Sequence, residues 1–328
     1  MDSRAGLPAT MRAVRFHRFG GPEVLQVETI PIPRPRPGEV LVQVKATSVN
    51  PVDWKLRAGL LTAFVRHPFP VVPGFDIAGT VVGVGPGAGD PELEVGTDVF
   101  GATGLESAGG YAQYVAVPAE RLATVPEGLT YRTAAAIPTA GATAWKAIFD
   151  PDAADLRPGQ SVLIHGAAGG VGHLALQLAV WHGGTAYATA SPGNHDYLLE
   201  LGATRVIDYH TARFEDELRD LDAVVDLIGG EVTTRSIRVL RPGGTLVAAV
   251  PGTPSEADIA AATAIGVRAQ NLYAELSLKP IVTIARLAAE GILQVTLSQT
   301  LTLDQVAAAH RESEHGHTRG KIILEPFG

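Results

Sequence analysis

The stretch that decides the fold is SVLIHGAAGGVGHLALQLA, residues 161–179. An apolar run leads into a glycine-rich turn, and apolar residues at helical spacing follow directly. This order matches the G-x-G-x-x-G fingerprint of a dinucleotide-binding βαβ unit, where small residues let the backbone approach a pyrophosphate at the N-terminus of a helix. The stretch therefore predicts a cofactor loop. The alternative is a tight turn such as any α/β protein contains.

Small residues occupy the positions where the fingerprint needs them. Ala167, Gly169 and Gly172 take the three small positions, and Gly172 would let the helix pack closely on the sheet. Gly166 and Gly170 add backbone freedom to the turn. Together with the two positions between them, the expected cofactor-binding residues of this loop are Gly166, Ala167, Ala168, Gly169, Gly170, Val171 and Gly172.

The next expected strand, TAYATAS, ends at Ser191, where an NAD-specific site places an Asp or Glu on the ribose 2′-hydroxyl. A neutral residue permits a 2′-phosphate and favours NADPH as the cofactor. We expect Asn194, His195 and Tyr209 to contribute hydrogen bonds, although Asn194 is equally suited to cap the following helix. No Lys or Arg lies between Ser191 and Arg205, so the usual positive partner of a phosphate is missing locally.

The rest of the chain changes texture twice. Before about residue 130, alternating runs such as EVLVQVKATSVN (39–50), separated by Gly and Pro, predict an antiparallel or barrel-like β domain. From there to about residue 275, strands alternate with helices in the manner of βαβ units, which predicts a parallel sheet in an α/β fold. The tail that follows is β-rich and is expected to return to the first domain.

Composition excludes several kinds of site. The 328 residues carry a net charge of −8, which disfavours nucleic acid or an anionic membrane as the main partner. The chain has no cysteine, so disulfides, thiolate metal sites and a cysteine nucleophile are excluded. It shows no signal peptide and no apolar run of the ~20 residues that span a bilayer. We therefore expect a cytoplasmic protein, with residues 1–10 as a disordered leader.

Several motifs in the same order give the chain a family resemblance. They include MRAVRFHRFGGPEVLQVE, PRPRPGEVLVQVKATSVNPVDWKLRAG, PGFDIAGTVVGVG, GGYAQYVAVPAERLATVPEGL, HGAAGGVGHLALQLA, LGATRVIDY and HTRGKIIL. From Met11 onward the sequence resembles the zinc-independent quinone oxidoreductase branch of the medium-chain dehydrogenase/reductase superfamily. The resemblance implies a GroES-like β-barrel substrate domain, residues 1–135 and 275–328, and a Rossmann doubly wound parallel-sheet domain, residues 136–274, with the active site in the cleft.

The resemblance also assigns residues and partners. It implies that Thr143 approaches the nicotinamide and that Arg319 and Lys321 lie close to the cofactor or the cleft. It further implies a homodimer, formed through the edge that the last Rossmann strands present.

Zinc-dependent members of the superfamily carry metal ligands at positions that read differently here. Asn50 stands where a cysteine ligand would be, and Phe75 stands where a histidine ligand would be. We therefore expect no metal at the family site. The remaining histidine group, His310, His315 and His317, is interpreted as a solvated helix end and loop.

Without a metal, side-chain donors must stabilise the charge that develops on a carbonyl oxygen. The candidate catalytic residues lie in NPVDWKLRAG: Asn50 as an amide donor, Asp53 to orient it, and Lys55 to stabilise an enolate or supply a proton. The structural alternative is a turn, a helix cap and a solvated lysine. Arg57 is expected in a surface or domain-interface salt bridge.

A tyrosine that some relatives place at position 61 is a leucine here, which leaves the proton donor open. The apolar run LLTAFVRHPFP (60–70) suggests a lid.

Three functions fit these features. The first is an NADPH-dependent, zinc-independent reductase that transfers hydride to a quinone or an α,β-unsaturated carbonyl. The second is an enoyl reductase or tailoring enzyme acting on a polyketide-like biosynthetic intermediate, because fold and cofactor do not choose between substrates. The third is an NADPH-binding sensor or structural protein with little redox activity.

Overall fold

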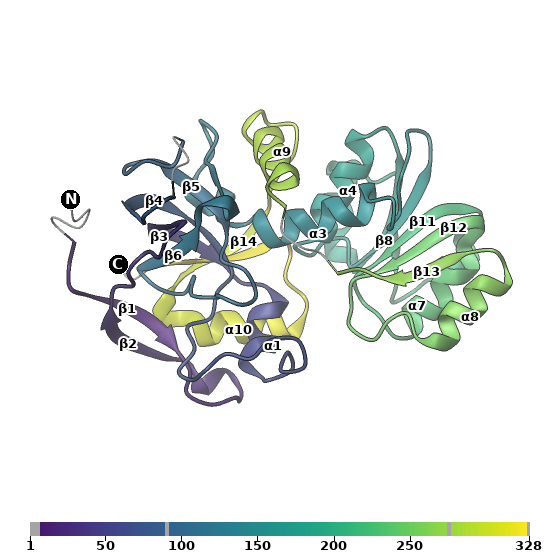
Figure 1. Cartoon of the computed structure of the whole chain (residues 1–328). Coiled ribbons are helices and arrows are strands. Elements are labelled where there is room, and N and C mark those ends of the chain that lie inside the picture. Colours follow the sequence, from purple (N-terminus) through teal and green to yellow (C-terminus); the bar gives the residue numbers. More distant parts are fainter. Residues whose placement is uncertain (1–6, 89–91, 274–276, 327–328) are drawn as a thin grey trace. The chain divides into compact units, whose positions relative to one another are not determined.

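The computed structural model describes residues 7–88, 92–273 and 277–326 (Figure 1). The chain forms two compact units. Unit 1 comprises residues 1–139 and 276–328, and unit 2 comprises residues 140–275.

Unit 2 is built on one six-stranded parallel sheet. Its strands are β8 (Ser161–His165), β9 (Thr185–Ala190), β10 (Arg205–Asp208), β11 (Leu221–Asp226), β12 (Leu240–Ala248) and β13 (Arg268–Asn271). Their order, β10-β9-β8-β11-β12-β13, runs outward in both directions from β8 and β11. This is the strand order of the Rossmann fold, in which ligands bind at the carboxyl ends of the two central strands.

Helices cover both faces of this sheet. They are α4 (Gly172–Trp181), α5 (His195–Glu200), α6 (Phe214–Glu217), α7 (Glu231–Ser236) and α8 (Glu256–Ala264). In Figure 1, α4 lies on one face and α7 and α8 lie on the other, as right-handed crossovers on either side of the switch point require. A buried cluster that includes Leu163, Val224 and Leu246 connects three strands beneath the helices.

Unit 1 contains a two-stranded ribbon and a seven-stranded sheet. The ribbon pairs β1 (Thr10–Arg15) with β2 (Gln26–Pro31). The sheet consists of β3 (Glu39–Ser48), β4 (Asp76–Val84), β5 (Asp98–Ala102), β6 (Tyr114–Pro118), β7 (Leu122–Thr124), β14 (Leu297–Thr302) and β15 (Lys321–Glu325). The C-terminal strand β15 pairs with β3 at Ile323 and Ser48, so the tail does return to the first domain.

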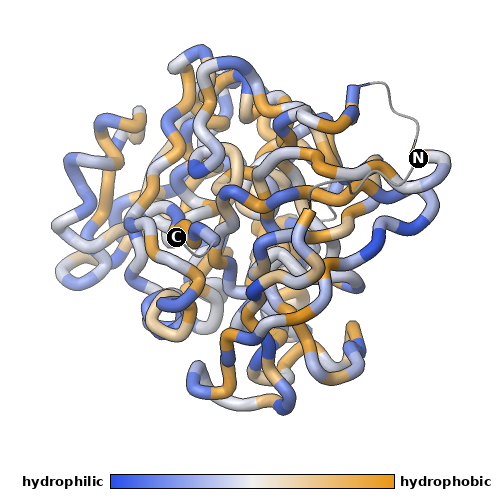
Figure 2. The backbone as a smooth tube through the Cα atoms, turned by 90° about the vertical axis from the view of Figure 1, so that its left-hand side faces the viewer, coloured by the Kyte–Doolittle hydropathy of each residue, from blue (hydrophilic) through white to orange (hydrophobic). Residues whose placement is uncertain are grey.

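The other helices begin or lie in unit 1: α1 (Pro51–Arg57), α2 (Tyr131–Ala135), α3 (Pro138–Phe149), α9 (Leu278–Ala289) and α10 (Val306–His315). Pro138 separates α2 from α3, as its lack of a backbone donor predicts. Inward-facing valines of β3 and β4 form one core cluster. The alternation of hydrophobic and hydrophilic residues is visible as changing colour along the tube in Figure 2.

The expected α/β fold class is confirmed, with a GroES-like domain and a Rossmann-like domain. The expected leader is wrong in part, because Leu7 packs against the core and β1 begins at Thr10; residues 1–6 lie outside the described residues. Among the described residues, no helix has the length and apolar character needed to cross a membrane.

Candidate active site

The glycine-rich loop of unit 2 has the geometry of a dinucleotide cradle. Gly166 follows β8 with φ +67°, a conformation that favours glycine. A Cβ on Gly172 would lie 2.3 Å from the Gly166 carbonyl oxygen and 2.6 Å from Cα of Ala167, so only glycine allows this close return of helix to loop. The loop backbone then leads directly into the N-terminus of α4, where the helix dipole favours an anion. The expected residues 166–172 therefore form one continuous loop that fits a pyrophosphate.

A second group of expected cofactor residues gathers where β9 and β10 end. The register pairs Ala190 with Asp208, so Ser191 and Tyr209, which follow them, are side by side. The Asn194 amide donates to the Ser191 hydroxyl at 3.2 Å. The Asn194 side chain makes no cap hydrogen bond to α5, so its expected alternative role as an N-cap is not realised in this geometry.

The loop that follows β11 is fixed by a buried carboxylate. Asp226 is fully buried and accepts hydrogen bonds from the backbone N–H groups of Ile228 and Gly229 and from the Thr233 hydroxyl. Since β8 and β11 are the central strands, this rigid loop faces the same edge of the sheet as the glycine-rich loop.

Unit 1 holds a buried polar cluster organised by Asp76 at the start of β4. Its Oδ1 accepts from the backbone N–H and the hydroxyl of Thr139, at 2.9 and 2.6 Å. Its Oδ2 accepts from the Ser48 hydroxyl at 2.6 Å and from the Asn50 amide at 2.7 Å. A carboxylate that receives four hydrogen bonds is satisfied as an anion although it is fully buried.

Asn50 and Lys321 meet inside this cluster. The Lys321 ammonium donates to the backbone oxygen of Val49 at 2.9 Å and to Oδ1 of Asn50 at 2.5 Å, and it lies 3.9 Å from Oδ2 of Asp76. Burial lowers the pKa of Lys321, and the two nearby carboxyl groups raise it. Both polar ends of the Asn50 amide are therefore occupied within the protein. The second amide hydrogen of Asn50 is directed at the Ser48 hydroxyl oxygen, 3.4 Å away. Asn50 therefore holds Lys321 and Asp76, and both of its amide hydrogens have acceptors within the protein.

Asp53 is the titratable member of the cluster. It closes the capping box of α1, accepting at Oδ2 from the Asn50 N–H at 2.7 Å. Its other oxygen, Oδ1, is buried without a hydrogen-bond partner among the described residues. Burial raises the pKa of Asp53 to about 7, an effect that the Asp76 charge adds to and the Asn50 N–H, Lys321 and the Tyr111 hydroxyl oppose. This carboxyl group is therefore poised to change charge near neutral pH.

A chain of buried side chains leads from Tyr111 to the surface. The Arg57 guanidinium lies 3.2 Å from Nδ1 of His310, whose Nε2 lies 3.4 Å from the Tyr111 hydroxyl, and Arg57 also pairs with Glu314. Arg57 can only donate, so Nδ1 of His310 accepts and Nε2 carries the hydrogen. Burial, reinforced by Arg57, lowers the pKa of His310 to about 3 and keeps it neutral.

Two expectations about the buried side chains Arg57 and His310 are wrong. Arg57 is 2% exposed and binds within unit 1, in place of the expected surface or domain-interface salt bridge. His310 is fully buried, whereas His315 and His317 are exposed as expected. An apolar helix face carries His310 inward, and its contacts with Arg57 and Tyr111 satisfy both ring nitrogens.

Lys55 differs from every other ionisable group of α1. Its side chain is half-buried, burial lowers its pKa, and no carboxylate pairs with it among the described residues. Its ammonium lies 5.5 Å from the centre of the Trp54 ring. The backbone oxygen of Lys55 accepts from Leu60, which begins a run of exposed apolar residues that includes Phe64 and Phe69. An unpaired ammonium therefore lies on the helix that leads into an apolar surface.

Three expected residues remain to be placed. Thr143 lies on α3 in unit 2, and Arg319 directly precedes β15 in unit 1. Lys321 belongs to the Asp76 cluster. Their roles toward a cofactor stay predictions.

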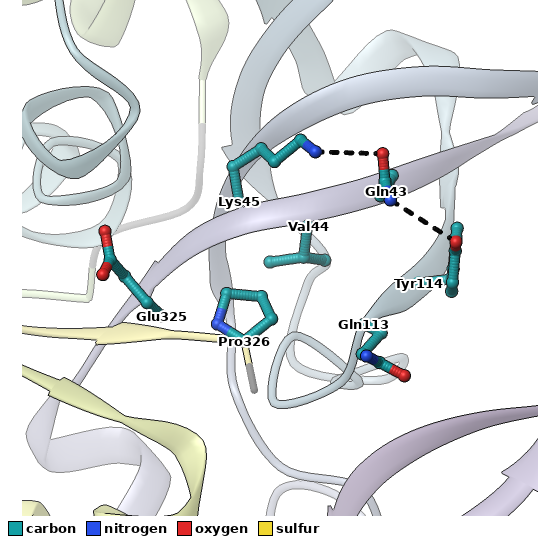
Figure 3. A pocket seen from close by; sticks show the side chains of 7 residues that line it. All are labelled: Gln43, Val44, Lys45, Gln113, Tyr114, Glu325 and Pro326. Carbon is teal, nitrogen blue, oxygen red and sulfur yellow. Dashed lines mark hydrogen bonds between the residues drawn. The ribbon is translucent and has the colours of Figure 1, made fainter. Parts of the chain in front are cut away.

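A shallow hollow elsewhere in unit 1 shares no residue with these groups (Figure 3). Lys45 donates to Gln43 at 3.0 Å, and Gln43 donates to the Tyr114 hydroxyl at 3.4 Å. Its volume of about 270 Å³ is below the usual range of ligand pockets. We assign it no function, because its polar side chains are bound within the protein: Gln113 accepts from the Arg12 N–H, and Glu325 accepts from Arg132. The lining residues are Gln43, Val44, Lys45, Gln113, Tyr114, Glu325 and Pro326.

Known protein families match segments of this chain in both units. The alcohol dehydrogenase GroES-like domain family matches residues 36–127, and the zinc-binding dehydrogenase family matches residues 201–324. The chain is 36% identical over 245 residues to the synaptic vesicle membrane protein VAT-1 homolog of Mus musculus. That alignment covers 72% of this chain and 58% of the mouse protein, so the chain spans less than two thirds of that relative.

Longer matches decide the family. The 2-methylene-furan-3-one reductase of Solanum lycopersicum is 32% identical over 98% of this chain and 80% of its own length. The quinone oxidoreductase of Coxiella burnetii superposes with a TM-score of 0.88 at 34% identity, covering 96% of this chain and 99% of that one. The chain belongs to the medium-chain dehydrogenase/reductase superfamily, in its quinone oxidoreductase branch.

A further member of this branch has been solved with a ligand. The Escherichia coli quinone oxidoreductase complexed with NADPH has a TM-score of 0.84 at 25% identity, covering 96% of this chain and 100% of that one. Membership of this family and the Rossmann fold support a nicotinamide cofactor for the present chain.

The description of one matching family names zinc, and the sequence contains no cysteine. Across residues 7–88, 92–273 and 277–326, no group of three or more His, Cys, Asp or Glu side chains is placed to hold a metal ion. At the two positions that differ from zinc-dependent members, Asn50 binds Asp76 and Lys321, and Phe75 is buried in the core.

Sequence reasoning missed the residue that organises the cluster in unit 1. Asp76 lies in PGFDIAG, where a charged residue interrupts the apolar run between Phe75 and Ile77 at the start of β4. A buried carboxylate requires several donors, so this interruption was the available signal. Tyr111 is fully buried, and its contact with His310 has no sequence signature.

Proposed function

We propose that this medium-chain reductase uses NADPH, without zinc, to reduce a quinone or an α,β-unsaturated carbonyl compound. Its relatives named 2-methylene-furan-3-one reductase and quinone oxidoreductase support these acceptor classes. The observation that carries the proposal is Lys55, a half-buried ammonium with a lowered pKa and no carboxylate partner in the described part of unit 1, followed in sequence by exposed apolar residues.

The cofactor fits the residues that are present. The Gly172 position excludes any side chain, and the loop that precedes it delivers the pyrophosphate to the N-terminus of α4. Ser191 in place of an acid leaves room for a 2′-phosphate. When bound, reduced nicotinamide supplies a hydride, which is one proton and two electrons. Thr143, Arg319 and the loop residues 166–172 are proposed to hold and orient this group.

The side chains of this protein are proposed to stabilise the negative charge that develops on the substrate and to supply the proton. Hydride addition to the β-carbon of an enone moves an electron pair onto the carbonyl oxygen. Lys55 is proposed to stabilise that oxyanion and to return a proton to the α-carbon, so that the carbon–carbon double bond is reduced. With a quinone, the same proton goes to oxygen and gives the hydroquinone. A lowered pKa makes Lys55 a better proton donor than a solvated lysine.

The buried cluster around Asp76 is proposed to fix the position of α1, the helix that carries Lys55. Asn50, Asp76 and Lys321 anchor the start of α1, β4 and β15, and therefore hold α1 in place. Asp53 joins this framework through the capping box. We propose that Asn50, Asp53 and Lys321 position α1, and that Asn50 does not donate directly to the substrate, because these side chains are hydrogen-bonded within the cluster.

Zinc independence is supported by the donor set, since the position of one family ligand is filled by an amide that is already bound on both sides. The experiment is steady-state oxidation of NADPH with a panel of quinones and enones, in the presence and absence of a zinc chelator. Turnover that is insensitive to the chelator supports the proposal. Tight NADPH binding without turnover of any acceptor would favour a sensor or structural role.

A further inference from the structure

The corner of unit 2 where β9 and β10 end has an unusual charge composition. Between residues 191 and 210, Arg205 is the single Lys or Arg. It lies at the start of β10, at the opposite end of the strand, and forms an ion pair with Glu217. The next arginine, Arg213, pairs with Glu215. No permanently charged cation of this segment is therefore available at the corner.

Two histidines lie at the corner instead. His195 is half-buried at the start of α5, and its Nε2 lies 3.4 Å from the backbone oxygen of Ala190. His210 is exposed, and its ring centre lies 4.3 Å from that of Tyr209. Neither imidazole makes another side-chain hydrogen bond among the described residues. Each ring can therefore gain a proton and offer an N–H to a ligand without breaking an existing contact.

The acid of this corner is already anchored. Asp208 accepts from the His210 backbone N–H at 3.0 Å and from the Thr211 hydroxyl at 2.9 Å. These hydrogen bonds, first of all that of the His210 N–H, lower the pKa of Asp208, and the charges of His210 and His195 act in the same direction. Asp208 is thus ionised, tied to its own turn, and within electrostatic reach of both rings. The other acid beside the pair is the exposed Asp196 on α5.

The charge of the corner therefore depends on the histidines. With both rings neutral, the pair and its two acids, Asp208 and Asp196, sum to −2, which repels a phosphate. With both rings protonated, the same four groups sum to 0, so the repulsion is removed and two charged N–H donors are offered to a phosphate. The uncharged ribose of NADH experiences neither effect.

We propose that His195 and His210 are specificity-determining residues that recognise the 2′-phosphate of NADPH in place of a fixed cation. This inference rests on the proposed function, which places an adenine dinucleotide at this edge of the sheet. Ser191 and Asn194, which are hydrogen-bonded to each other, are proposed to contribute uncharged hydrogen bonds to the same phosphate. The preference for NADPH over NADH then rises as the pH falls through the range in which histidine titrates.

The test is a fluorescence titration of the full chain with NADPH and with NADH, from about pH 8.5 to about pH 5.5. We expect the ratio of the two dissociation constants to change in favour of NADPH by at least ~10-fold over this range, which corresponds to one additional charge interaction in a partly screened site. The double variant His195→Gln with His210→Gln should lose this rise. The phosphate itself loses charge in acid, with a pKa of about 6, but it does so equally in both proteins.

Two further variants sharpen the result. His182→Gln, at the C-terminal end of α4, is the matched control and should keep the wild-type rise. Asn194→Lys supplies a fixed cation and should give a ratio that favours NADPH with little dependence on pH. A wild-type ratio that is flat with pH, or a double variant that retains the rise, would overturn this inference while the proposed function stands. Failure to bind either dinucleotide would overturn both.

Discussion

The ammonium group of Lys321 lies 2.5 Å from the side-chain oxygen of Asn50, although 271 positions separate the two residues. One belongs to the C-terminal strand β15 and the other precedes α1. Asp76 completes the group by accepting from Asn50 and facing Lys321 at 3.9 Å. The end of the chain therefore supplies the positive charge that two acids, Asp53 and Asp76, need in the interior of unit 1.

Lys321→Met should test this dependence. Removing one partner leaves buried negative charge uncompensated, which costs about 3–5 kcal/mol in the free energy of unfolding. Urea unfolding followed by circular dichroism measures the loss. Lys279→Met, on the exposed side of α9, is the control and should change stability by less than about 0.5 kcal/mol. Equal stability of the two variants would contradict the assigned role.

Tyr111→Phe should shift the titration of Asp53. The Tyr111 oxygen accepts from His310, and the Tyr111 hydroxyl acts on Asp53 to lower the pKa of that carboxyl group. Without that donor the pKa of Asp53 should rise above about 7. Carbon-13 NMR of the aspartate carboxyl groups reads the shift directly.

The matched pair His310→Gln and His310→Leu separates polarity from packing in this chain. Glutamine can accept from Arg57 and donate to Tyr111, and should leave the Asp53 titration near that of the wild type. Leucine should move it in the direction that Tyr111→Phe does. If both substitutions have the same effect on the Asp53 titration, the hydrogen bonds of His310 do not influence Asp53 and His310 contributes packing alone.

The Rossmann unit could be read from the sequence because its requirements are local. A Cβ at Gly172 has no room, and Ser191 stands at a position where an acid or its absence has a defined meaning. The buried groups could not be predicted from the sequence, because Lys321 reaches Asn50, and His310 reaches Arg57, only after the two ends of unit 1 have folded together. Long side chains that look solvated in a sequence become buried when distant partners satisfy them.

Gly172→Ala should weaken cofactor binding without touching a ligand-contacting side chain. The added Cβ meets backbone atoms at 2.3 and 2.6 Å, so loop and helix must separate. We expect at least a ~10-fold rise in the dissociation constant for NADPH, because the pyrophosphate cradle is displaced. Gly193→Ala is a suitable control, since its Cβ meets nothing within 4 Å. Unchanged affinity in Gly172→Ala would contradict the proposed cradle.

Acid should destabilise the protein through two buried histidines. Burial lowers the pKa of His165 to about 4 and that of His310 to about 3. The unfolded chain binds protons at these sites from about pH 6.5 downward, whereas the folded chain does not, so the two histidines lower stability as the pH falls. The raised pKa of Asp53 acts in the opposite direction over the same range, so the contribution of His310 is taken from the difference between wild type and variant. Urea midpoints between about pH 7 and pH 4 measure the slope. His310→Gln should make this slope shallower, and an unchanged slope would show that His310 is not buried as a neutral group.

Lys55 should affect turnover more than binding. We expect Lys55→Ala to lower kcat by about 10²-fold or more, in the range found for general acids, with the dissociation constant for NADPH unchanged. Lys55→Arg keeps the charge but is a far weaker proton donor, and should retain binding with low turnover. A rate equal to that of the wild type in Lys55→Ala would remove Lys55 from the mechanism.

The most direct measurement of the central claim is a single turnover. The protein is loaded with one equivalent of NADPH and mixed, without oxygen, with a quinone or an enone, and the nicotinamide fluorescence is followed. The account predicts its complete loss with formation of one equivalent of hydroquinone or saturated ketone. Bound NADPH that persists in front of every acceptor of both classes would contradict the claim that this protein is a reductase.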